Sequence, residues 1–146
     1  MGIFGQFLVG GAVSIVNISV HALVMTFVVQ VSRALARRDR SSQPLFLTWM
    51  MIGTVSILMA AHTCEVLVWS LAYSILGVVA QDASKIYFAF VNYTTLGYGD
   101  VIPNKEWQLL GPITAMNGVL MFGWSTAVIF EVLRRSLELG AGRSRQ

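Results

Sequence analysis

The N-terminal part of the chain lacks charge: residues 1–32 contain no Asp, Glu, Lys or Arg. Over the whole chain of 146 residues only 12% are charged, whereas a soluble domain usually has about 25%. Hydrophobic residues make up 55%, and the mean hydropathy is +0.68. A helix needs only about 20 apolar residues to cross a hydrocarbon core of roughly 30 Å. The sequence therefore predicts an integral membrane protein and excludes an ordinary soluble domain.

Several other features are also missing. No basic residue precedes the first apolar run and arginines follow it, which favours a retained membrane helix over a cleaved secretory signal. The single cysteine, Cys64, excludes a disulfide within the chain. We find no catalytic pair, phosphate-binding loop or metal-ligand motif, so we expect no enzyme and no cofactor other than a permeant ion. The basic residues lie beside apolar segments, which gives no indication of nucleic-acid binding.

Three membrane-spanning helices are expected, over residues 6–32, 45–79 and 109–133. Basic clusters follow the first and the third, and the positive-inside rule places both clusters in the cytoplasm. The N-terminus and the segment 80–108 are then expected outside the cell membrane. The first cluster lacks the every-third-residue spacing of a voltage-sensing helix. The two clusters comprise Arg33, Arg37, Arg38, Arg40, Arg134, Arg135, Arg143 and Arg145.

The segment between the second and third spans is too short to cross a membrane and too apolar for an exposed loop. The aromatic-rich stretch "KIYFAFVNYTT" follows Asp82 and Ser84, either of which can cap a short helix. Glycines end this helix after about ten residues. A helix that dips into the membrane and returns as extended chain fits, because non-helical backbone at that depth must be buried in protein or line a water-filled cavity.

The returning chain begins with "TTLGYGD", residues 94–100. Gly97 and Gly99 have no Cβ and can take left-handed backbone conformations. Alternated with Leu96 and Tyr98, they can point successive carbonyls to one side, and Thr95 adds a hydroxyl at the inner end. Rings of carbonyl oxygens replace the hydration shell of a cation. The heptapeptide is therefore interpreted as the lining of a cation path.

This motif resembles the selectivity filter of potassium channels, with Leu96 at a position where the family has valine. The resemblance covers about residues 46–133, because the family places such a loop between an outer and an inner helix. It implies K⁺ coordination by carbonyls and, since one strand cannot surround an ion, a homotetramer with four-fold symmetry. The implied ion-binding residues are Thr95, Leu96, Gly97, Tyr98 and Gly99, with K⁺ at the first four.

The residues expected to support the filter are Thr94, Asp100 and Tyr87. Some members of the family have a glutamate in the pore helix that bonds the aspartate behind the filter, but Val91 occupies that position here. Tyr87 stands where many members have a tryptophan, and its hydroxyl can replace that partner. The other interpretation is that Asp100 is simply solvated at the outer mouth.

Each notable residue of the third span has two interpretations. Gly118 is either a gating hinge, as the resemblance implies, or a small residue that permits close helix packing. Asn117 faces the central cavity or bonds a neighbouring helix. Glu131 attracts cations to the inner mouth or pairs with Arg134 or Arg135 at i+3 or i+4 spacing; we expect the pair.

Four polar residues, Asn17, His21, His62 and Glu65, fall near mid-depth on the first two spans. Ionisable groups at that depth are costly and are usually paired or functional. We expect His21 and Glu65 to join the first helix to the second, leaving the apolar face of the first to lipid. Metal ligation by His21, His62 and Glu65 is the less favoured interpretation.

The expected fold is thus an all-α membrane protein with three transmembrane helices per subunit, a re-entrant pore helix and filter loop, and a tetramer around a central pore. Residues 1–44 form the peripheral helix and Arg-rich loop, 45–135 the pore domain and 136–146 a short cytoplasmic tail. Membrane lipid and K⁺ are the expected partners. The expected function is passive, potassium-selective conduction. A non-conducting assembly subunit and a weakly selective cation pore are the alternatives.

Overall fold

The computed structural model describes residues 2–38 and 44–141, and this part of the chain is all-α, with no strand. Asp39, Arg40, Arg143 and Arg145, which bear on the expected topology, lie outside the described residues. The elements are α1 (Ile3–Arg38), α2 (Pro44–Leu76), α3 (Lys85–Tyr93), the short 3₁₀ turn η1 (Lys105–Trp107) and α4 (Leu110–Ala141).

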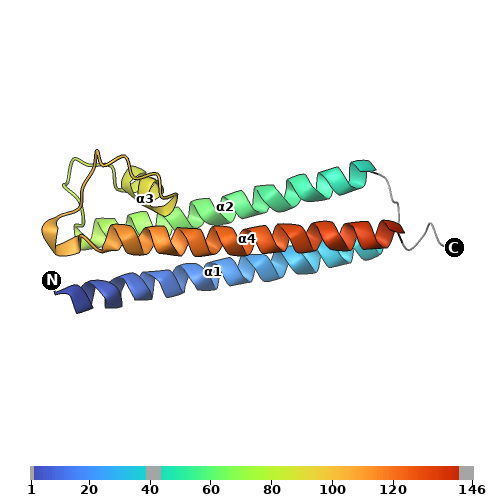
Figure 1. Cartoon of the computed structure of the whole chain (residues 1–146), viewed down its shortest axis with the longest axis horizontal. Helices are drawn as coiled ribbons and strands as arrows, with labels where there is room; N and C mark the ends of the chain where they lie inside the picture. The colour runs from blue at the N-terminus through green and yellow to red at the C-terminus, as the bar shows by residue number, and fades with distance from the viewer. Residues whose placement is uncertain (1, 39–43, 142–146) are drawn as a thin grey trace.

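Three helical segments are long and apolar enough to cross a membrane: Ile3–Leu35, Leu45–Leu76 and Lys105–Arg135. They lie side by side as an elongated bundle, with α4 between α1 and α2 in the view of Figure 1. The start of α1, the end of α2 and the start of α4 lie at one end of the bundle, together with α3. This is the up-down-up arrangement expected for three consecutive spans.

The helices differ in length from the sequence-based expectation. α1 and α4 continue to Arg38 and Ala141, so both run beyond the apolar residues, and part of the expected tail is helical. α2 stops at Leu76, because Gly77 has a φ of +62°. The N–H of Val78 donates to the carbonyl of Tyr73 at 3.1 Å, which is the glycine-terminated cap that satisfies the last carbonyls of a helix.

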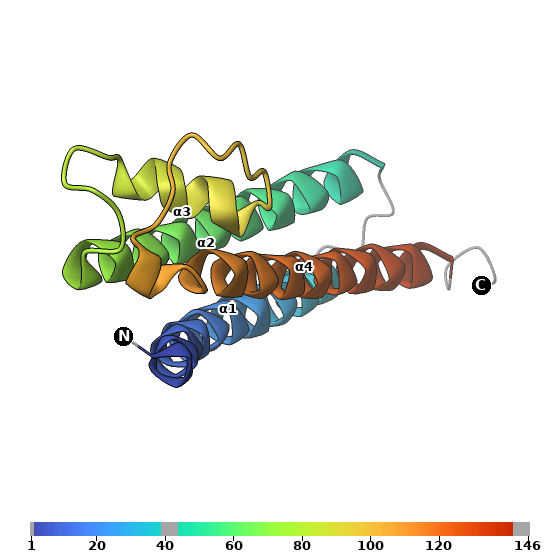
Figure 2. The same ribbon diagram turned by 60° about the vertical axis from the view of Figure 1, so that its left-hand side comes forward.

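The short helix α3 is re-entrant. Its N-cap is Ser84, whose hydroxyl oxygen accepts from the N–H of Tyr87 at 3.3 Å. α3 then runs back along the bundle beside α2, as Figure 2 shows, and the chain returns to the same end. Its last residue, Tyr93, bonds Glu65 of α2, which precedes the end of α2 by about three turns, or roughly 16 Å. Asn104 closes the returning chain by donating to the carbonyls of Gly77 and Val78.

The packing divides each helix into a buried and an exposed face. The larger cluster of buried hydrophobic residues joins α2, α3 and α4 and includes Trp69, Tyr73, Phe88 and Leu110. α1 packs closely on α4 at Gly10, where an added Cβ would lie 2.8 Å from the side chain of Ile113. The opposite face of α1 exposes many large apolar side chains, as expected for a surface that contacts lipid rather than water. The exposed set on α1 includes Phe4, Phe7, Leu8, Ile15, Val16, Leu23 and Phe27.

Candidate ion-conducting filter and its supports

The loop after α3 has the backbone pattern expected for a row of aligned carbonyls. Thr95, Gly97 and Gly99 have φ values of +60°, +60° and +78°. Leu96 and Tyr98, which lie between them, have no such positive φ. Alternation between left-handed and ordinary conformations turns successive carbonyls toward one side. Thr95 is the one non-glycine residue with a positive φ in the described part of the chain, a conformation that costs an L-residue about 1–2 kcal/mol.

Hydrogen bonds hold the N–H side of this loop against α3. The N–H of Thr95 donates to the carbonyl of Asn92 at 2.9 Å, and that of Leu96 to Val91 at 2.9 Å. The N–H of Gly97 also reaches Val91, at 3.4 Å. Within residues 2–38 and 44–141, four successive carbonyl oxygens accept no hydrogen bond: those of Thr95, Leu96, Gly97 and Tyr98.

Asp100 has the tyrosine partner expected from the sequence. The Tyr87 hydroxyl donates to Oδ2 of Asp100 at 2.7 Å, and Oδ1 of the same carboxylate accepts from the N–H of Val101 at 3.1 Å. The hydrogen bond to Asp100 raises the pKa of Tyr87 above its usual range. This bond links the start of α3 to the outer end of the loop and closes the loop on itself.

We expect Tyr87→Phe to weaken the loop, because it removes the donor to Asp100 at almost unchanged volume. Water screens a hydrogen bond between exposed groups, so we expect a small loss of stability. The effect is measured as a lower melting temperature of the variant in thermal unfolding. Asp100→Ala removes the other partner. If Tyr87→Phe and Asp100→Ala have additive effects in the double variant, the bond does not support the loop.

Gly118 lies where α4 meets the end of α3. A Cβ at Gly118 would be 2.0 Å from the carbonyl oxygen of Tyr93 and 3.0 Å from its carbonyl carbon. α4 is assigned as one helix from Leu110 to Ala141, through this residue. Of the two interpretations of Gly118, the structure therefore supports close packing, because the backbone of Tyr93 lies where a Cβ would be.

Of the two interpretations of Asn117, the structure shows the second, a bond to neighbouring helices. Its side chain is buried, and Oδ1 accepts from the Asn17 amide at 3.2 Å and the Trp69 indole N–H at 3.1 Å. Asn17 also donates to the backbone carbonyl of Glu65 at 3.3 Å. Oδ1 of Asn17 is buried without a hydrogen-bond partner among the described residues. Asn117 thus joins α4 to both α1 and α2.

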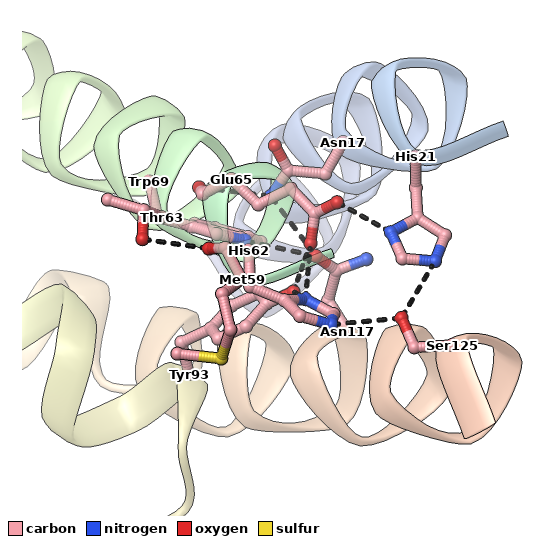
Figure 3. Close-up of polar contacts among 10 residues, drawn as sticks. All are labelled: Asn17, His21, Met59, His62, Thr63, Glu65, Trp69, Tyr93, Asn117 and Ser125. Atoms are coloured by element: carbon pink, nitrogen blue, oxygen red, sulfur yellow. Dashed lines mark hydrogen bonds and ion pairs between the residues drawn. The ribbon is translucent and has the colours of Figure 1, made fainter. Parts of the chain in front are cut away.

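Beside Asn117, four helices contribute side chains to one buried cluster, shown in Figure 3 and here called the Glu65 cluster: His21, His62, Glu65, Tyr93 and Ser125. Nδ1 of His21 lies 2.7 Å from Oε1 of Glu65, so the predicted contact between these two residues is present. Oε2 accepts from the Tyr93 hydroxyl and lies 3.2 Å from Nδ1 of His62. Nε2 of His62 is 3.0 Å from Oγ of Ser125, and Nε2 of His21 is 3.5 Å from the same oxygen. Glu65 and His21 are fully buried.

The metal-binding interpretation concerns the same residues. Ligand atoms of His21, His62 and Glu65 lie within 4.8 Å of one another, a set that suits a first-row transition metal. All of these atoms, however, already have hydrogen-bonding partners inside the cluster. The arrangement is complete as a hydrogen-bond network that joins α1, α2, α3 and α4.

We expect Glu65→Ala to destabilise the protein by about 3 kcal/mol or more, because it removes the shared acceptor and leaves buried donors unpaired. His21→Ala should lower the free energy of unfolding by less, since Glu65 keeps two other hydrogen-bonding partners. In the double variant the loss should be smaller than the sum of the two, as measured by thermal unfolding in detergent or lipid. Additive losses would show that the two residues are not energetic partners. Thr63→Ala, which removes an exposed hydroxyl two residues before Glu65 on α2, is the matched control.

Glu131 forms the expected pair rather than a free negative charge at the end of the bundle. Oε2 accepts from Nε and Nη2 of Arg134 at 3.1 and 2.9 Å, and Oε1 accepts from Nε of Arg135. Glu131 therefore has two neutralising partners on its own helix, at i+3 and i+4. Such exposed pairs add little stability.

Sequence reasoning missed Tyr93 and Ser125 in the Glu65 cluster. The position of Ser125 could have been predicted from the sequence, since it follows Asn117 by eight residues and so falls on a similar face of α4. No sequence pattern indicates the role of Tyr93, because its partner lies on another helix.

Comparison with known proteins identifies the family. The model of a family described as ion channel matches residues 45–135, more than half of the chain. The chain therefore belongs to this ion channel family, and with its three apolar helices it is a membrane protein. The matched residues contain α3, the filter loop and nearly all of α2, and most of α4, whereas α1 lies outside them. No curated protein and no solved structure matches the chain.

Proposed function

We propose that this ion channel conducts K⁺ selectively and passively through the loop Thr95–Gly99, with four copies of the chain arranged around a common axis. The four unpaired carbonyls, aligned by alternating positive φ values, carry the proposal. A dehydrated cation must exchange its water oxygens for protein oxygens at little cost. Neutral carbonyl oxygens that have no internal donor are the groups suited to that exchange.

The proposed tetramer follows from coordination. One loop presents its carbonyls on one side, so a closed shell of oxygens around an ion requires further copies. Leu96 and Tyr98 are 53% and 68% exposed in the single chain. In a tetramer these apolar and aromatic side chains would pack between subunits, behind the carbonyls. The end of α3 would direct its negative dipole toward the axis and favour a cation there.

The proposed orientation places the N-terminus and the filter loop outside the cell membrane and the C-terminus in the cytoplasm. Arg134 and Arg135 belong to the last turns of α4, and this end of α4 lies at the end of the bundle opposite to α3 (Figure 1). Under the positive-inside rule that end is cytoplasmic. Ser84→Cys, made together with Cys64→Ser, tests this orientation. The new thiol should react with a membrane-impermeant thiol reagent in intact cells, and no reaction would contradict the orientation.

Purified protein reconstituted in liposomes tests the function directly. A K⁺ gradient should drive a K⁺ flux that depends on the protein, and reversal potentials in mixed K⁺ and Na⁺ should favour K⁺ by at least about tenfold, or about 1.4 kcal/mol. Conduction without this preference would support a weakly selective cation pore. Absence of any flux from intact, folded tetramers would support a non-conducting assembly subunit.

A further inference from the structure

The first helix, α1, is not among the residues that define the family match, yet it contacts the buried core of the matched region. α1 packs along α2 and α4 in Figures 1 and 2. It contributes two fully buried polar side chains, Asn17 and His21. A helix that served only to fill the lipid-facing surface would need neither of them, since burying polar groups is costly unless they are hydrogen-bonded. Their partners indicate what α1 does.

A continuous chain of contacts leads from α1 to the filter loop. Nδ1 of His21 lies 2.7 Å from Oε1 of Glu65, and the other oxygen of that carboxylate accepts from the Tyr93 hydroxyl. Tyr93 is the last residue of α3, directly before Thr94 and Thr95. The same turn of α3 accepts the N–H groups of Thr95 and Leu96. Tyr93 therefore belongs to the turn of α3 that holds the first residues of the filter loop.

The position of Tyr93 is held at two points. Its backbone carbonyl is pressed against Gly118 of α4, where no Cβ would fit. Its hydroxyl is held by Glu65 and lies 3.0 Å from Nδ1 of His62. Within the described residues, the carboxylate oxygen of Glu65 that does not touch Tyr93 has His21 as its hydrogen-bond partner. Without His21, we expect the Glu65 carboxylate to rotate toward its remaining partners, His62 and Tyr93.

We propose that His21 and Glu65 are positioning residues for the filter, through which the peripheral helix α1 sets the ion selectivity of the pore. This inference rests on the proposed function, since it presupposes a selective pore. His21 orients the Glu65 carboxylate, Glu65 holds the Tyr93 hydroxyl, and Tyr93 sets the height and tilt of the last turn of α3. Buried, fully hydrogen-bonded networks of this kind specify one arrangement of the groups they join.

Two substitutions at His21 test the proposal. His21→Leu removes both ring nitrogens at similar volume, whereas His21→Asn keeps an amide N–H donor the same number of bonds from Cβ as Nδ1. Ser19→Ala is the control, because Ser19 is exposed on the same helix and bonds only its own turn, at the carbonyl of Ile15. Tyr93→Phe removes the hydroxyl at the other end of the chain of contacts.

For each variant the ratio of K⁺ to Na⁺ permeability is measured from reversal potentials, and the thermal stability of the tetramer is measured in parallel. We expect His21→Leu and Tyr93→Phe each to lower the ratio by about tenfold, which corresponds to about 1.4 kcal/mol. The double variant should fall little further, because both changes break one chain of contacts. His21→Asn should recover most of the ratio, and Ser19→Ala should leave it unchanged.

A merely structural role gives a different result. Lower stability of His21→Leu at an unchanged permeability ratio would overturn the proposal, as would equal ratios for His21→Leu and His21→Asn. Failure of the proposed function is distinguished by the unaltered chain, which would then show no K⁺ preference at all. If His21→Leu does not assemble, two other variants give the measurement: Tyr93→Phe, which keeps the aromatic ring, and Glu65→Gln, which replaces one of the two accepting oxygens by an amide NH₂. Each should lower the permeability ratio, and unchanged ratios in both would overturn the proposal.

Discussion

Substitution of Gly99 or Gly97 by alanine is expected to abolish potassium-selective flux while four subunits still assemble. Both glycines have positive φ values, +78° and +60°, and an L-residue in that region costs about 1–2 kcal/mol. In a tetramer this conformational cost would apply to each of the four loops that line the ion path. An added Cβ would meet no atom closer than 3.9 Å in its own chain, so backbone conformation, not a clash within the subunit, is the reason. The loop is expected to relax by turning carbonyls away from the axis.

Gly77→Ala is the matched control for this prediction. Gly77 has a φ of +62° and, like Gly99, has nothing within 4 Å of an added Cβ. It therefore carries the same conformational penalty, but at the end of α2 and outside the filter. Gly77→Ala should lower thermal stability and leave the K⁺ to Na⁺ permeability ratio unchanged. Wild-type selectivity in both Gly97→Ala and Gly99→Ala, measured by reversal potentials, would remove the filter assignment.

Much of the fold was predictable because membrane proteins have few structural solutions. Long uncharged runs predict spanning helices, and a short apolar segment between two spans predicts a re-entrant one. Contacts within one helix, such as Glu131 with Arg134 and Arg135, follow from the helical repeat. The contact between His21 and Glu65 was predictable because two ionisable groups at one depth in neighbouring helices have few other partners. Helix ends were less predictable, since α1 and α4 continue past their apolar residues.

Contacts that depend on how α3 is seated were not predictable. The bond from Tyr93 to Glu65 and the approach of Tyr93 to Gly118 require the rotation and depth of α3, and no sequence period encodes these. The sequence leaves two interpretations of Asn117, a residue that faces the cavity or one that bonds a neighbouring helix, because a polar residue on the third span fits either. The structure shows the bond to neighbouring helices, because the N–H groups of Asn17 and Trp69, on two other helices, donate to the side-chain oxygen of Asn117.

A large loss of stability is expected from Gly118→Ala. The new Cβ would lie 2.0 Å from the Tyr93 carbonyl oxygen, whereas Cβ atoms essentially never come closer than 3.0 Å to a neighbouring atom. The atoms that the Cβ would meet belong to the backbone of Tyr93, whose side chain is held by the Glu65 cluster. The clash therefore cannot be relieved by moving a flexible side chain. α3 and α4 must separate by about 1 Å, and such overpacking costs about 1–3 kcal/mol or more in each subunit. We expect a large fall in the melting temperature and, on size-exclusion chromatography, loss of the proposed tetramer.

Gly123→Ala isolates the cause, because Gly123 lies on the same helix and has nothing within 4 Å of an added Cβ in this chain. Both substitutions gain the same helix propensity, about 1 kcal/mol in favour of alanine. Gly123→Ala should therefore be neutral or stabilising, and the difference between the two variants measures the contact with Tyr93. A gating hinge at Gly118 predicts the opposite pattern: Gly118→Ala would assemble with unaltered stability and change only the fraction of time that the pore is open. Single-channel recordings of the assembled variant would reveal that outcome, and it would show that the approach of Tyr93 to Gly118 is not required for the fold.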